Sequence, residues 1–214
     1  MLFGGPEAIR IRRADGSGEP RTLLEKPGVA VPNFSRDGSW VAFYVVDPET
    51  GRDLWALSMD NPEEPTVVLR TSANEARPVI SPDGGFLAYQ SDSSGRWEIY
   101  VQPFPAGEGR WQVSVDGGQH PSWRPDGGEL YYVADDALMV VTIATEPSVQ
   151  IGPPHRLFTG RDIGTRLSLP RHVEGFYNPA PDGARFAVVH GVGQGTSDIV
   201  LATGELEALD ETEQ

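Results

Sequence analysis

An all-β fold built from repeated sheets is predicted by three features of this 214-residue sequence. A short segment containing Asp-Gly recurs four times, and a strand-like apolar run follows each copy. The four aspartates are separated by 46, 43 and 56 residues. Glycine (25 residues) and proline (19) are abundant, which favours turns over long helices. A period in the forties with short strands predicts a β-propeller: four complete four-stranded blades plus a half blade, consistent with a partial propeller.

The repeated segments are predicted to be turns that carry structural aspartates. The four segments are 35–38, 81–84, 124–127 and 180–183, and their aspartates are Asp37, Asp83, Asp126 and Asp182. Three of the four segments have proline second and all four have glycine fourth, which suits a type I turn, and aspartate can accept hydrogen bonds from nearby backbone amides. Equivalent turns in a propeller are spread around a ring, whereas a catalytic carboxylate pair is separated by about 5–10 Å. We therefore expect these aspartates to hold turns and not to act on a substrate.

Within each unit the strands are expected in the same order. The predicted strands are 29–34, 40–46, 53–57 and 66–69; 78–80, 86–89, 98–101 and 111–115; 121–123, 130–133 and 138–143; and 186–189 and 198–201, with 206–209 as a weaker candidate. Pro32, Pro78 and Pro121 each stand five residues before the aspartate of their unit, where a strand can begin. Strands 9–12 and 21–24 align with residues 54–69, so the chain opens with a half unit.

One domain is expected over residues 8–204, with an N-terminal extension at 1–7 and an acidic tail at 205–214. The fourth interval is longer because of an insertion near residues 159–172. This insertion carries a local basic patch, Arg161, Arg166, Arg171 and His172. Irregular loops on a regular scaffold often carry binding sites, so the patch is either a binding loop or a decorative one.

Composition excludes several functional classes. The net charge of −14 disfavours nucleic acids and anionic lipid surfaces as partners. The absence of cysteine excludes disulfides and thiolate sites. The N-terminus lacks the pattern of a secretory signal, and no apolar run approaches the ~18 residues of a membrane helix. No membrane insertion is therefore expected, while the compartment stays open: cytoplasmic as written, extracytoplasmic within a longer protein.

No catalytic, cofactor-binding or metal-binding residue is predicted. The four histidines (His120, His155, His172 and His190) are scattered without the spacing of a ligand pair. His120 and His190 adjoin predicted strands and are interpreted as packing or loop residues. The five tryptophans recur at repeat positions, which favours packing between blades over a base-stacking platform; they are Trp40, Trp55, Trp97, Trp111 and Trp123. No Gly-x-Ser-x-Gly hydrolase motif is present.

The repeat resembles the PD40, or WD40-like, repeat of TolB-type propellers. The resemblance rests on the proline five residues before aspartate, on the Asp-Gly turn and on an acidic-apolar-aromatic third strand. Asp53-Leu54-Trp55 and Glu98-Ile99-Tyr100 match that third-strand element, Asp198-Ile199-Val200 matches it in part, and Ala137-Leu138-Met139 departs from it. The resemblance covers about residues 8–202 and implies a propeller fold more than a particular function, since propellers serve many functions.

A narrower resemblance is to the C-terminal propeller of bacterial eukaryotic-like serine/threonine kinases. It rests on residues 98–105, 111–114, 117–118, 124–132 and 154–158. Such propellers imply a sensor or interaction module. The kinase glycine-rich loop, His-Arg-Asp and Asp-Phe-Gly motifs are absent from this sequence, so no phosphotransfer is implied.

The expected function is a non-enzymatic interaction or ligand-sensing module that forms part of a larger protein and binds a protein or peptide without a cofactor. The alternative is the non-catalytic propeller of a kinase or a prolyl-oligopeptidase-type enzyme. An open arc of blades would expose apolar strands, so either closure into a five-unit ring or self-association is expected.

Overall fold

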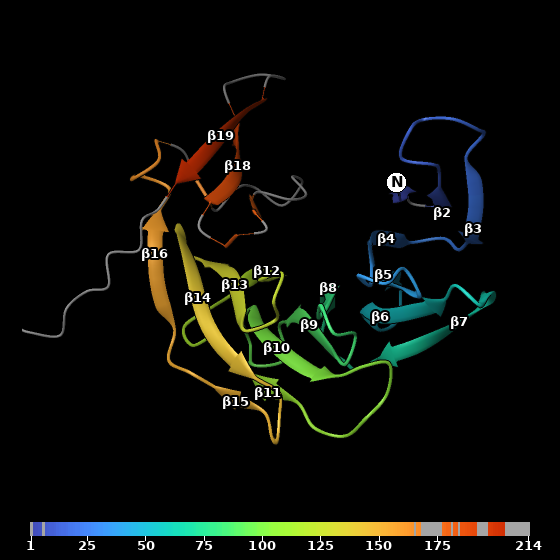
Figure 1. The fold of residues 1–214 in the computed structure, drawn as a ribbon. Helices are drawn as coiled ribbons and strands as arrows, with labels where there is room; N and C mark the ends of the chain where they lie inside the picture. The colour runs from blue at the N-terminus through green and yellow to red at the C-terminus, as the bar shows by residue number, and fades with distance from the viewer. Residues whose placement is uncertain are drawn as a thin grey trace, which may run out of the picture.

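The computed structural model describes residues 2–5, 7–164, 166–167, 177–180, 182–183, 185–191 and 197–203. These residues form nineteen strands in five antiparallel sheets. Figure 1 shows the sheets following one another along an open arc, from the blue N-terminal sheet to the red C-terminal one. The predicted all-β propeller fold is confirmed. Among the described residues no helix is long and apolar enough to span a membrane.

The first sheet has three strands, in the order β1 (Leu2–Gly5), β2 (Ala8–Ile11) and β3 (Arg21–Glu25). Strand β1 pairs with β2, with Leu2 opposite Ile11 and Gly5 opposite Ala8. The expected N-terminal extension is therefore wrong for residues 2–5, which belong to this sheet. The expected half blade accordingly contains three strands instead of two.

The three central sheets carry the full repeat. Their strands are β4 (Val29–Phe34), β5 (Trp40–Asp47), β6 (Gly51–Ser58) and β7 (Asn61–Leu69); β8 (Glu75–Ile80), β9 (Phe86–Ser91), β10 (Glu98–Pro103) and β11 (Trp111–Gln112); and β12 (Gln119–Trp123), β13 (Glu129–Ala134), β14 (Ala137–Ala144), β15 (Gln150–Ile151) and β16 (His155–Thr159). Strands β15 and β16 were not expected, and both pair with β14. Strand β7 begins at Asn61, inside the expected loop, and β11 is shorter than expected.

The last sheet contains β17 (Tyr177–Pro179), β18 (Arg185–Gly191) and β19 (Ser197–Thr203), in that order. The fourth unit was expected to be a complete four-stranded blade, and three of its strands lie in the described part of the chain. The candidate strand at 206–209 and the acidic tail at 205–214 lie outside the described residues.

The core consists of apolar layers between neighbouring sheets. One layer joins Ile99 and Val101 of β10 to Leu130 and Tyr132 of β13, and all four side chains are buried. Strands such as β5 are buried on both faces because a sheet packs against each of them. This explains why their sequences are continuously apolar instead of alternating.

Tryptophans contribute to these layers, as the sequence predicted. The Trp123 indole Nε1–H donates to the Val79 carbonyl of the preceding sheet at 3.1 Å. The Trp40 ring meets Phe104 edge-on, with 5.5 Å between ring centroids. Both contacts join one repeat unit to the next.

The repeated Asp-Gly segments form the predicted turns. In the second central sheet, the Gly84 amide donates to the Ser81 carbonyl at 2.9 Å, and Gly84 adopts φ 79°, which glycine tolerates without strain. Asp83 Oδ1 accepts from the Ser81 hydroxyl at 2.5 Å and from the Gly85 amide at 3.1 Å. In the first central sheet, hydrogen bonds from Ser35 and from residue 39 lower the pKa of Asp37 to about 2. The aspartates hold the turns.

The turns lie closer together than their spread around a ring predicts. The Arg36 guanidinium in the first central sheet donates to the Pro125 carbonyl of the third at 2.7 Å. A pocket of about 230 Å³ lies between the second and third turns and is lined by both Asp83 and Asp126. The premise that these turns stay far apart is therefore wrong, because they join the two inner strands of each unit and so lie on the inside of the arc.

Candidate functional site

The inner strands of the three central sheets share one irregularity, a β-bulge at an X-Pro pair. In β4 two residues, Val31 and Pro32, face the single residue Phe43 of β5. The same extra residue occurs at Arg77-Pro78 in β8 and at His120-Pro121 in β12. Bulges bend a strand and redirect side chains, and they are frequent beside functional sites.

The residue before each proline has a left-handed backbone. The φ angles are 49° at Val31, 53° at Arg77 and 57° at His120. This conformation costs a residue with a side chain about 1–3 kcal/mol and persists only where the surroundings impose it. The β-branched Val31 is the most unusual of the three. Because the same left-handed conformation recurs at equivalent positions of three repeats, it is a regular feature of the fold and not a local accident.

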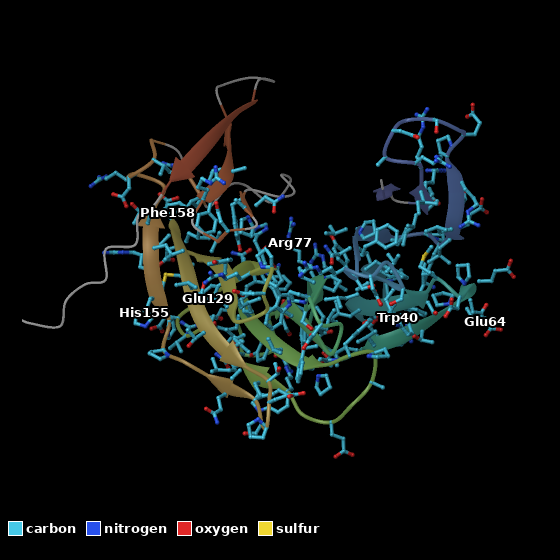
Figure 2. All side chains as sticks on the ribbon, viewed as in Figure 1. Trp40, Glu64, Arg77, Glu129, His155 and Phe158 are labelled. Carbon is cyan, nitrogen blue, oxygen red and sulfur yellow. The ribbon has the colours of Figure 1, made fainter. Side chains whose placement is uncertain are left out.

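The bulges surround a single pocket of about 180 Å³, here called the inner pocket. It is lined by Val31, Pro32, Asn33, Arg77, Pro78, Val79, His120, Pro121, Ser122 and Tyr177. Each of the three central sheets thus supplies the same three consecutive positions. Figure 1 shows β4, β8 and β12 on the concave side of the arc, and Figure 2 shows Arg77 on that side.

Tyr177 closes the pocket from the last sheet. It stands five residues before Asp182, where the other units have proline. Its hydroxyl donates to the His120 carbonyl at 2.7 Å, and burial raises its pKa well above the ordinary tyrosine value. The phenol therefore stays protonated and ties the last sheet to the bulge in β12.

His120 is held as a neutral imidazole. Burial, together with the nearby positive charge of Arg77, lowers the pKa of His120 to about 3. Its backbone amide donates to the Gln90 side chain at 3.0 Å, so a neighbouring sheet satisfies the bulged amide. His120 was predicted to be a packing or loop residue, and it lies in the pocket wall. Its position before a repeat proline was the signal that could have identified it.

The pocket between the second and third turns is a weaker candidate site, because its two carboxylates already accept hydrogen bonds within the turns. Asp83 accepts the two bonds described above. Asp126 accepts from the Gly128 amide at 3.0 Å and pairs with Arg124 Nε at 3.1 Å. Among the described residues, no group of three or more acidic or histidine side chains is placed to hold a metal ion.

The part of the basic insertion that the structure describes, residues 159–164 and 166–167, packs against the sheets through Leu167. The Leu167 side chain is fully buried, and its amide donates to the Asp136 carboxylate at 2.7 Å. Arg161 and Arg166 are exposed. Arg171 and His172, the other half of the predicted patch, lie outside the described residues. The two exposed arginines do not line the inner pocket.

Comparison with known proteins identifies the fold class. No family model and no curated protein sequence matches the chain. Among solved structures, TolB from Acinetobacter baumannii is similar, with 19% identity and a TM-score of 0.63 over 92% of this chain and 47% of that one. A puromycin-hydrolyzing peptidase from Mycobacterium tuberculosis has 22% identity and a TM-score of 0.61, over 98% and 35% of the two chains. A chain of a nidogen/laminin complex has 15% identity and a TM-score of 0.63, over 88% and 69%.

These likenesses show that the chain is a propeller module with a TolB-like β-propeller fold. The chain spans 56% of a TolB from Agrobacterium tumefaciens and 47% of the Acinetobacter protein, about half their length. At identities of 15–22% the similarity concerns the fold. The resemblance to kinase-associated propellers stays a prediction.

Proposed function

We propose that the chain is a non-enzymatic propeller module that binds a peptide segment of a partner protein at the inner pocket. One observation carries the proposal: three strained bulges at equivalent positions direct three different side chains, Val31, Arg77 and His120, to one place. Strain repeated around a concave site favours a binding role over accidental distortion.

The state of the titratable side chains in the pocket supports a binding role over a catalytic one. The low pKa of His120 makes it a weak base near neutral pH, and the high pKa of Tyr177 makes it a weak acid. A general acid or base works best with a pKa near the operating pH. A similar propeller occurs in a nidogen/laminin complex, which favours a protein as the partner.

Peptide selection tests the proposal. Random peptides displayed on phage are panned against the immobilised chain, and the enriched sequences are measured against Ser122→Trp, whose indole would fill the pocket. Ser94→Trp, in an exposed loop, is the matched control. We expect the selected peptides to lose at least about tenfold in affinity only with Ser122→Trp. No enrichment, or equal binding to a folded Ser122→Trp variant, would refute the pocket as the binding site.

The second candidate is the accessory propeller of an enzyme, favoured by the similarity to a puromycin-hydrolyzing peptidase. A propeller can frame an active site without supplying its reacting groups. The DNA upstream and downstream of this reading frame distinguishes the two candidates. An adjoining hydrolase or kinase reading frame in phase would favour the accessory role, and a free-standing short gene would favour the interaction module.

A further inference from the structure

A second pocket lies close to the inner one and has a different chemistry. The pocket of about 230 Å³ between the second and third Asp-Gly turns is here called the turn pocket. Its walls include the carboxylates of Asp83 and Asp126 and the indole of Trp123, and no basic side chain is among the described residues that line it. Carboxylates beside an aromatic ring attract an ammonium or a guanidinium group.

The turn uses only one oxygen of Asp83. Its Oδ1 accepts from the Ser81 hydroxyl at 2.5 Å and from the Gly85 amide at 3.1 Å. In the part of the chain that the structure describes, its Oδ2 accepts no hydrogen bond and the carboxylate makes no ion pair. A carboxylate can accept about four hydrogen bonds. The turn therefore orients Asp83 and leaves one of its oxygens able to accept from a bound ligand.

Asp126 contributes less, because cations of the chain lie beside it. Its Oδ1 accepts from the Gly128 amide, and its Oδ2 pairs with Arg124 Nε at 3.1 Å. Arg124 also pairs with Glu129 at 3.2 Å, so one positive charge is shared between two carboxylates. The Arg36 guanidinium reaches the same turn through the carbonyl of residue 125. Asp83 is thus the principal negative group of the turn pocket.

Trp123 links the turn pocket to the inner pocket. Its side chain is buried, and the indole Nε1–H donates to the Val79 carbonyl at 3.1 Å. Trp123 lines the turn pocket and Val79 lines the inner pocket, so this hydrogen bond joins the two sites. It also holds the ring in place, and a cation is attracted more strongly to an aromatic ring where water is excluded.

The two pockets follow one another along the same strands. Residues 77–79 of β8 line the inner pocket and Ser81, directly after β8, lines the turn pocket; on β12 the change falls between Ser122 and Trp123. Extended chain advances about 3.3 Å per residue. A peptide that runs beside these strands therefore passes from one pocket to the other within about three residues. Its first contact is with the proline rings and Val31 of the inner pocket, and its second is with carboxylate.

We infer that the peptide bound at the inner pocket carries a lysine or arginine about three residues from its apolar contact, and that this basic side chain enters the turn pocket and binds Asp83. This inference rests on the proposed peptide-binding function and specifies its ligand. A volume of about 230 Å³ is below the roughly 300–1,000 Å³ of a drug-sized site, which suits a single side chain. The net charge of −14 favours the approach of a basic segment.

The test uses the whole chain and defined probes. N-acetyl-Leu-Ser-Ser-Lys-amide and its reversed sequence are titrated by calorimetry against analogues with arginine or norleucine in place of lysine, and against n-butylammonium. Norleucine keeps a linear side chain and removes the charge. We expect the basic peptides to bind about fivefold more tightly than the norleucine peptides, since Asp83 is exposed and water weakens the ion pair. The n-butylammonium ion should bind more weakly than the basic peptides.

Asp83→Asn removes the charge and keeps an oxygen that can accept from Ser81 and Gly85. We expect this variant to lose the preference for basic peptides and to keep the affinity for the norleucine peptides. Asp37→Asn is the matched control: Asp37 accepts from the Ser35 hydroxyl and the Ser39 amide in the first turn, and it does not line the turn pocket. It should keep the full preference.

Two further measurements keep the test independent of folding defects. Thermal unfolding of each variant separates loss of binding from loss of fold. In the unsubstituted protein, the NMR signal of the Trp123 indole Nε1–H should shift more with the lysine peptide than with the norleucine peptide, because only the lysine places a charge beside the ring. An equal shift would count against the inference even if Asp83→Asn unfolds.

The remaining outcomes separate this inference from the proposed function. Equal binding of basic and norleucine peptides, or equal loss of preference in Asp83→Asn and Asp37→Asn, refutes the inference and leaves peptide binding intact. A preference that persists in Ser122→Trp shows that the cation binds without the inner pocket and refutes a shared peptide. Binding of n-butylammonium as tight as that of the basic peptides shows that the turn pocket takes free amines instead.

If no probe binds, the phage-selected peptides decide. Enrichment of lysine or arginine that is lost with Asp83→Asn supports the inference, and selected peptides without such enrichment refute it. If phage selection also yields no binding peptide, the proposed function fails together with the inference.

Discussion

Replacing Ser81 with alanine tests whether the Asp-Gly turns stabilise the propeller. The Ser81 hydroxyl makes two hydrogen bonds: it donates to Asp83 Oδ1 at 2.5 Å and accepts from the Phe86 amide at 2.9 Å. The side chain is 3% exposed, so water has little access to replace it. Substitution removes both bonds and leaves the Phe86 amide hydrogen without its acceptor.

The expected cost follows from these two bonds. A net hydrogen bond contributes about 0.5–1.5 kcal/mol, a bond to a charged group about 1.5–3, and a stranded buried donor about 1–3. Asp83 borders solvent and can exchange its lost donor for water, which reduces the first contribution. We therefore expect Ser81→Ala to lower the free energy of unfolding by about 2 kcal/mol, a roughly 30-fold change in the folding equilibrium.

Equilibrium unfolding in urea, followed by tryptophan fluorescence, measures this change. The midpoint should fall while the slope stays constant, because the surface exposed on unfolding does not change. Ser94→Ala is the control, since its hydroxyl makes one exposed bond to the Arg96 carbonyl at 3.1 Å. We expect it to stay within about 0.5 kcal/mol of the wild type. An equally small effect at Ser81 would refute the reasoning that these turns hold the sheets together.

Two further predictions concern pH and assembly. Burial raises the pKa of Glu75, whose Oε1 accepts from Thr71 at 2.6 Å, while its Oε2 has no hydrogen-bond partner in the part of the chain that the structure describes. A raised folded-state pKa stabilises the protein below the ordinary value of 4.5, and this stabilisation is lost as pH rises through the folded-state value. The free energy of unfolding of Glu75→Gln should therefore increase relative to that of the wild type as the pH rises from about 4 to about 8. A difference between the two that stays constant over this range would contradict the prediction. The sheets that the structure describes form the open arc of Figure 1 instead of a five-unit ring. We therefore expect light scattering to detect self-association that grows with concentration, and an elongated monomer at all concentrations would disprove it.

The repeat made most of the fold predictable. Proline, Asp-Gly and a buried apolar strand recur with fixed spacing, and each has a local physical reason to adopt its structure. Elements outside the repeat were missed for the opposite reason. Strand β1 (Leu2–Gly5) has two glycines and no partner signal in its own sequence, and β16 departs from the outer strands of the other units. Strand β1 forms by pairing with β2, and β16 forms by pairing with β14; neither pairing is indicated by the sequence of the strand itself.

The inner pocket could be predicted only in part. The prolines at its rim were recognised by their spacing, but the residues before them were not singled out. Residues that precede proline favour extended backbone, and β-branched residues such as Val31 rarely adopt positive φ. Sequence rules therefore predict the reverse of what is observed at Val31, Arg77 and His120, because the bulge is imposed by the pairing of whole strands.

In the bulges of the inner strands, the shape of the backbone does not depend on which side chain it carries. Valine, arginine and histidine occupy equivalent positions within one chain, with φ values only 8° apart. Because the backbone accepts an aliphatic, a cationic and an aromatic side chain at the same point, single codon changes there are expected to alter the proposed ligand preference while the sheets stay intact. Residues 31, 77 and 120 are therefore the positions at which point mutations are expected to change the chemistry of the inner pocket without changing its backbone.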